Sequence, residues 1–113
     1  MELVTERLAD ALLIRVMEQR IDAAVAIQFK DRMRELTDGA GPRVVLDLSR
    51  VGFLDSSGLG AVVAVMKHLG ATSRLELAGL TPSVEKVFRL TRMDSVFTIH
   101  ATVPPSGALS QAV

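Results

Sequence analysis

Short apolar runs of strand length alternate with stretches of helical periodicity, and this alternation limits the fold more than any other feature of the chain. Helical patterns occupy residues 23–36, 55–69 and 82–92. The strand-length runs lie at residues 3–8, 11–17, 43–48, 74–78 and 96–99. Strands alternating with helices predict an α/β fold with a mixed central sheet of about four to five strands packed with three or four helices. The first two runs adjoin, so the chain is expected to open with a hairpin.

The predicted elements have recognisable boundaries. Asp22 is a good N-cap for the first helix, and Thr81 followed by Pro82 begins the third. Residues 49–54 are expected to form a loop before the second helix. That helix carries the clearest apolar stripe, formed by Leu59, Val62, Val63, Met66 and Leu69. Residues 101–113 contain two adjacent prolines and are expected to be a loose tail with a final turn at 108–112.

Composition removes several classes of function. With 113 residues the chain is expected to be a single domain, residues 1–113, with its core at about 3–100. Thirteen basic residues balance thirteen acidic ones, so the chain lacks the positive electrostatic field that attracts nucleic acids. It also has no Tyr or Trp on which bases could stack. Cysteine is absent, which excludes disulfides and thiol chemistry. No signal peptide or membrane-length apolar run is visible, so we expect a cytoplasmic protein without direct membrane insertion.

The chemically informative segment is the start of the second helix, Asp55-Ser56-Ser57-Gly58. It follows a predicted buried strand, and functional sites in α/β sheets lie beyond the carboxyl ends of strands. A capped helix start explains the segment on spacing alone. The alternative is that Ser56 is modified, because a helix N-terminus accommodates a phosphate. Gly58 and Gly60 favour this alternative if they leave a bare patch for another protein; tight packing against the sheet is the competing explanation.

Enzymatic interpretations find little support. A hydrolase elbow needs glycine on both sides of the nucleophile at Gly-x-Ser-x-Gly spacing, and neither Ser56 nor Ser57 has it. His68 follows Ser56 by twelve residues, roughly 18 Å along one helix, so it is not placed as a base. His100 is expected at a strand end. A phosphate loop is also absent. We therefore expect no catalytic residues, no metal and no cofactor.

A basic series, Lys86, Arg89 and Arg92, recurs every three residues along the third helix. A solvated helix face accounts for it. The alternative is a basic edge that docks an acidic partner or a phosphate.

Residues 44–63 strongly resemble the phosphorylation segment of STAS domains, specifically the bacterial anti-sigma factor antagonists. The segment Asp55-Ser56-Ser57-Gly58-Leu59-Gly60 matches that family's Asp-Ser-Ser-Gly-Leu-Gly pattern. Residues 75–99 are similar to its Gly-Leu-x-Pro-x-Val helix and last strand, in the same order. The resemblance covers about residues 8–99. The chain departs from the family at Gln19-Arg20-Ile21, where a glycine usually precedes Asp22, and at Pro104-Pro105, which interrupt the usual C-terminal helix.

The resemblance implies a partner-switching regulator rather than an enzyme. In such proteins the unphosphorylated antagonist binds an anti-sigma factor, which is a serine kinase of the histidine-kinase ATPase fold, and frees the sigma factor. The kinase phosphorylates the serine after the aspartate, here Ser56 with Ser57 as the alternative, and a serine phosphatase resets the protein. The implied partner-binding residues are Asp22, Asp55, Ser56, Ser57, Gly58, Leu59 and Gly60. We expect a monomer.

Two alternatives stay open. The first is a non-switching STAS accessory subunit of a membrane transporter complex, which does not need a phosphorylatable Ser56. The second is a serine hydrolase, which requires an activity that Ser56→Ala or Ser57→Ala abolishes.

Overall fold

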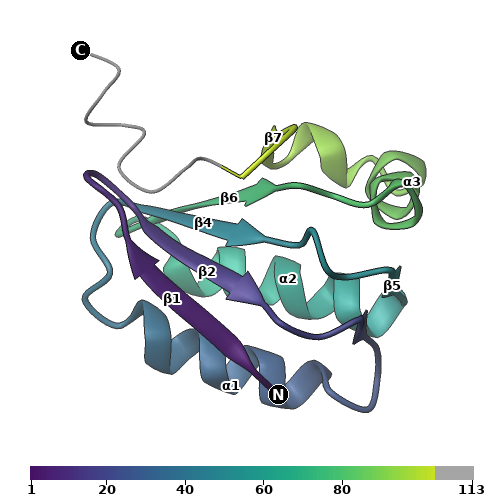
Figure 1. The fold of residues 1–113 in the computed structure, drawn as a ribbon, viewed down its shortest axis with the longest axis horizontal. Coiled ribbons are helices and arrows are strands. Elements are labelled where there is room, and N and C mark those ends of the chain that lie inside the picture. Colours follow the sequence, from purple (N-terminus) through teal and green to yellow (C-terminus); the bar gives the residue numbers. More distant parts are fainter. Residues whose placement is uncertain (104–113) are drawn as a thin grey trace.

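A five-stranded mixed sheet with helices packed on it forms the body of the protein (Figure 1). The computed structural model describes residues 1–103. The strand order is β1-β2-β4-β6-β7, where β1 pairs antiparallel with β2 and the other neighbours are parallel. These strands are β1 Leu3–Arg7, β2 Leu12–Val16, β4 Arg43–Asp47, β6 Arg74–Ala78 and β7 Thr98–His100. The predicted α/β class, mixed sheet and opening hairpin are confirmed.

The helices are α1 Ala26–Thr37, α2 Ser56–Leu69 and α3 Pro82–Leu90, followed by a short 3₁₀ turn, Met93–Ser95. The main core lies between the sheet and the helices, where Ile14 and Leu46 from the strands meet Phe29 and Met33 from α1. A smaller apolar cluster, which includes Leu13 and Val45, belongs to the residues pointing to the opposite face of the sheet. Within residues 1–103 no helix has the length and hydropathy needed to cross a membrane.

Two very short strands were not predicted. β3 Arg20–Ile21 pairs in parallel with β5 Phe53–Leu54, and together they form a separate two-stranded sheet. The expectation of a plain loop at residues 49–54 is therefore wrong at its end. Two-residue strands are too short to show a period of two, and only the pairing with a distant segment defines them.

Some predicted boundaries also shift. The third helix ends at Leu90 rather than near residue 92, because Arg92 takes a left-handed backbone conformation with φ 61°. The last strand begins at Thr98 instead of residue 96, because the 3₁₀ turn occupies the preceding residues. The tail expected at 101–113, with its turn at 108–112, lies almost wholly outside the described residues.

The buried face of α2 differs from the predicted stripe. Val62 and Leu69 are buried as expected, but Leu59, Val63 and Met66 are only half-buried. The contact is instead completed by the small or inward-turned residues Gly58, Ala61 and Val65. Counting only large apolar side chains missed this, because close packing of the first turns selects residues without bulk.

A carboxylate lies buried on the outer face of the sheet. Glu76 on β6 is 1% exposed, and its Oε1 accepts from Arg43 Nε at 3.0 Å and lies 2.6 Å from His100 Nε2. Its Oε2 accepts from Arg74 Nε at 2.9 Å. Burial alone raises the pKa of Glu76, but the hydrogen bonds from Arg43 and His100, with the charges of Arg43 and Arg74, lower the pKa to about 2. The same contact raises the pKa of Arg43.

Candidate functional site

Ser56 is the first residue of α2 and is exposed to solvent. The preceding Asp55 is the N-cap, as the motif predicted, and its Oδ1 accepts from the Gly58 N–H at 2.8 Å. Its second oxygen, Oδ2, accepts from the Ala23 N–H at 3.2 Å. The Asp55 carboxylate therefore caps α2 and also joins it to the segment that leads into α1.

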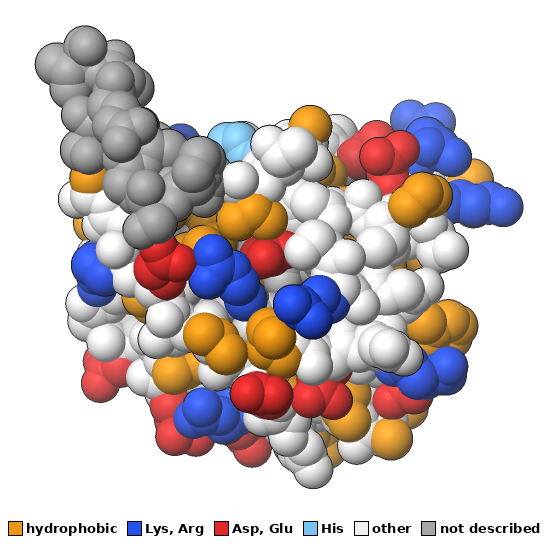
Figure 2. Space-filling view, viewed as in Figure 1, with side chains coloured by type: hydrophobic (Ala, Val, Ile, Leu, Met, Phe, Trp, Pro, Cys, Tyr) orange, Lys and Arg blue, Asp and Glu red, His pale blue; other side chains and the backbone are white. Residues whose placement is uncertain are grey.

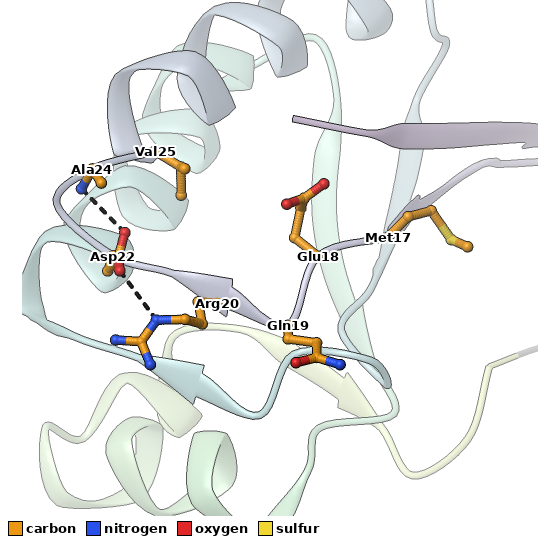
Figure 3. A pocket seen from close by; sticks show the side chains of 7 residues that line it. All are labelled: Met17, Glu18, Gln19, Arg20, Asp22, Ala24 and Val25. Carbon is orange, nitrogen blue, oxygen red and sulfur yellow. Dashed lines mark hydrogen bonds and ion pairs between the residues drawn. The ribbon is translucent and has the colours of Figure 1, made fainter.

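Asp22 lies on that segment. The prediction that Asp22 caps α1 is wrong. The N-cap of α1 is Val25, which makes no side-chain cap bond. The Oδ1 atom of Asp22 accepts from the Ala24 N–H at 3.1 Å (Figure 3). The Asp22 carbonyl accepts from the Val25 N–H, also at 3.1 Å. These bonds form a turn before the helix, because an Asp side chain readily bonds the backbone two residues on.

The structure brings Asp22 and Asp55 together at one rim. The two carboxylates accept from successive backbone amides, Ala24 N–H and Ala23 N–H respectively. Asp22 also pairs with Arg20 through Nε and Oδ2 at 3.3 Å. Asp22 and the serine motif, which the resemblance implies as partner-binding residues, therefore lie at the same rim. The rim adjoins an open hollow of about 470 Å³, lined by residues 17–20, 22, 24 and 25 (Figure 3).

Backbone bonds between the two loops hold the rim in place. The Gln19 carbonyl accepts from the N–H groups of Gly52 and Phe53, at 2.9 and 3.2 Å. The β3–β5 ladder follows immediately, with Ile21 opposite Leu54. Segments 33 residues apart in sequence are therefore joined just before the helix that carries Ser56.

The two glycines of the motif have different surroundings. A Cβ on Gly58 would lie 2.9 Å from the Ile21 carbonyl carbon and closer still to its oxygen, whereas a Cβ on Gly60 would meet nothing within 4 Å. Gly58 is buried, so the bare-patch interpretation is wrong for it and the packing explanation holds. Gly60 and Ser57 are exposed and Leu59 is half-buried, which leaves these three beside Ser56 on the accessible surface.

Two side chains at this rim, Arg20 and Phe53, were not predicted as site residues from the sequence. Arg20 places its guanidinium carbon 4.3 Å from the centre of the Phe53 ring, and Phe53 is 42% exposed. Aromatic side chains and arginine are enriched in protein–protein interfaces, so this exposed pair is a candidate contact surface. The available signal was a phenylalanine in the short segment between a strand and a capped helix.

Neither histidine is placed beside Ser56. His68 lies in the last turn of α2, at the opposite end of the helix, and His100 lies against Glu76. Among residues 1–103 no group of three His, Asp or Glu side chains is arranged to hold a metal ion.

A STAS domain family model matches residues 2–104. The chain belongs to the STAS domain family. A curated relative from Bordetella bronchiseptica, the putative anti-sigma factor antagonist BtrV, is 33% identical over 91 residues, which are 80% of this chain and 78% of the relative.

Solved structures agree on the fold of this STAS domain. An anti-sigma factor antagonist from Mycobacterium paratuberculosis has a TM-score of 0.82 at 24% identity, covering 97% of this chain and 92% of that one. The anti-sigma factor antagonist SpoIIAA in its unphosphorylated form has a TM-score of 0.68 at 25% identity, covering 89% of each chain. The fold also occurs in a murine anion transporter, Slc26a9, with a TM-score of 0.77 at 15% identity and 19% of that chain covered.

The bridging role of Asp55 gives a local prediction. Asp55→Ala is expected to lower the free energy of unfolding by about 1–2 kcal/mol, the usual cost of removing an N-cap. Hydrogen exchange followed by NMR should show faster exchange of the Gly58 and Ala23 amide protons. Asp22→Ala is the matched control, because it should expose the Ala24 amide instead. Unchanged exchange at Ala23 in Asp55→Ala would contradict the bridge.

Proposed function

We propose that this STAS domain is an anti-sigma factor antagonist that works by partner switching. In its unphosphorylated form it binds an anti-sigma factor, a serine kinase of the histidine-kinase-type ATPase fold, and thereby releases the sigma factor or other target of that kinase. Phosphorylation of Ser56 by the kinase ends the binding, and a serine phosphatase restores it. The observation that carries the proposal is an exposed Ser56 at a helix start on the rim that holds Asp22 and Asp55.

The charge on that rim supports Ser56 as a switch. Phosphorylation adds about −1.5 to −2 charges at pH 7. The N-terminus of α2 tolerates an added negative charge, so the fold is expected to survive. A partner fitted to a neutral serine beside two carboxylates meets added like charge, which costs several kcal/mol across an interface. A loss of about 3–4 kcal/mol lowers affinity a few hundredfold.

Ser56 is proposed over Ser57 because the family motif places the acceptor directly after the aspartate. Both hydroxyls are exposed at the same helix start. Residues Asp22, Asp55, Ser57, Leu59 and Gly60 are proposed to contact the partner, while Gly58 supports the surface from below.

The test is a pull-down from the native host with wild type and Ser56→Asp as paired baits, supplied with ATP or ADP and read by mass spectrometry. Wild type is expected to recover a small ATPase-fold kinase, and Ser56→Asp is expected to lose it. Ser83→Asp is the matched control: Ser83 is another exposed serine in the first turn of a helix, and its variant should keep the kinase.

Other recoveries would overturn the proposal. If both baits recover the same transporter subunits, the accessory-subunit alternative replaces it. If Ser83→Asp loses the kinase as fully as Ser56→Asp, charge anywhere on the surface is sufficient and the Ser56 site is not specific.

A further inference from the structure

The end of α3 carries an apolar side chain that the fold does not use. Leu90 is 70% exposed, more than any other large hydrophobic residue among residues 1–103. Val96, after the 3₁₀ turn, is 48% exposed. The inward side of α3 is already filled by Val84 and Phe88, which are buried in the main core. Leu90 therefore lies outside the core and faces solvent.

Basic side chains accompany Leu90. Arg89 and Leu90 follow Lys86 by three and four residues. Residues at these spacings are neighbours on a helix surface, so all three lie on the outer half of α3. Arg89 pairs with Glu85 at 3.3 Å. Within residues 1–103, neither Lys86 nor Arg92 makes an ion pair or a side-chain hydrogen bond. Figure 2 shows Lys and Arg side chains gathered at the upper right, where Figure 1 places α3, with acidic and hydrophobic ones beside them.

The backbone at Arg92 is a second, independent observation. Arg92 has φ 61° and ψ 18°, and it is the only non-glycine residue with positive φ in the described part of the chain. It follows the helix C-cap Thr91, and glycine is the usual residue at that position because it adopts this conformation without steric cost. An arginine there bears that cost although its side chain makes no ion pair or hydrogen bond within residues 1–103.

We propose that Lys86, Arg89, Leu90 and Arg92, here called the α3 face, dock an acidic segment of a protein partner. Leu90 supplies the apolar anchor, and the cations around it supply electrostatic attraction and orientation. The occupant is a protein rather than an anionic membrane, because Glu85 and Asp94 interrupt the positive charge and are repelled by a uniformly anionic surface. The inference does not rest on Ser56 or on partner switching.

The experiment places the photo-crosslinker benzoylphenylalanine at Leu90 in the full chain in its native host. The expected result is one crosslinked protein, joined through a segment rich in Asp and Glu. Ile27 on α1 is the matched control position, because it is 68% exposed but lies outside the α3 face. The crosslinker at Ile27 should not give the same product.

Two further variants distinguish recognition from a structural role. In Lys86→Glu with Arg92→Glu the crosslink from Leu90 is expected to fall at least tenfold. Arg92→Gly removes the side chain and relieves the backbone, so its Tm is expected to rise while the crosslink falls several-fold. Survival of the crosslink in both variants would overturn the proposal, as would a crosslinked segment that is not acidic. Co-sedimentation with phosphatidylserine-rich vesicles, lost in Lys86→Glu with Arg92→Glu, would replace the protein partner by a lipid surface.

Discussion

Replacing Gly58 by alanine is expected to destabilise this domain by roughly 3 kcal/mol, the upper end of the cost of overpacking a core. The added methyl group would overlap the Ile21 carbonyl oxygen and approach the Leu54 side chain to 2.9 Å. The leucine tip can rotate, but the carbonyl belongs to the β3–β5 ladder and moves only with it. Urea denaturation monitored by circular dichroism measures the change.

Gly60→Ala is the matched control, two residues later in the same helix. Nothing lies within 4 Å of its added methyl group, so the expected effect is a gain of up to about 1 kcal/mol from better helix propensity. Equal effects of the two substitutions, in either direction, would show that helix propensity and not contact with Ile21 decides the cost at Gly58.

Glu76→Gln is expected to cost about 3 kcal/mol at pH 7, because it removes the negative charge that Arg43 and Arg74 contact at the buried position. The pKa of Glu76 is lowered to about 2 in the folded protein from an ordinary value of 4.5. The charged carboxylate therefore stabilises the fold fully above about pH 4.5. That contribution is lost as pH falls from about 4.5 towards 2.

The pH dependence provides the discriminating measurement. Thermal unfolding of wild type from pH 7 to pH 2 should show a loss of stability across that acid range, and Glu76→Gln should remove about 3 kcal/mol of it. Glu85→Gln is the control, because its pair with Arg89 is exposed and is expected to contribute less than about 1 kcal/mol. Parallel pH profiles for wild type and Glu76→Gln would show that the network does not hold the carboxylate in its charged form.

Glu76 also illustrates a limit of prediction from sequence. The alternation in residues 74–78 correctly predicts a strand, and it places Glu76 on the face away from the helices. A strand pattern does not show how many neighbours a strand has. Glu76 is buried because β6 is an inner strand, with β4 and β7 on either side, and those strands supply Arg43 and His100.

The sequence predicted the features of the candidate site that depend on neighbouring residues. It did not predict those that depend on contacts between distant segments. The Asp55 cap and the exposed Ser56 follow from a motif only a few residues long. The resemblance grouped Asp22 with the serine motif, and the structure places both at one rim. The prediction that Asp22 caps α1 is wrong, because the helix begins at Ala26 and not directly after Asp22. The position of Phe53 and the burial of Gly58 both depend on the β3–β5 pairing, which joins distant segments.

That pairing also has a consequence for how fast a partner can associate. The loops that present Asp22 and Ser56 are already joined by backbone bonds from Gln19 to Gly52 and Phe53. A surface fixed before encounter does not lose loop entropy when it binds, and association is slowed mainly where binding requires a rearrangement. In the proposed function, partner exchange at this rim should therefore not wait for the loops to rearrange, so that a change of charge acts directly on the rates of encounter and dissociation.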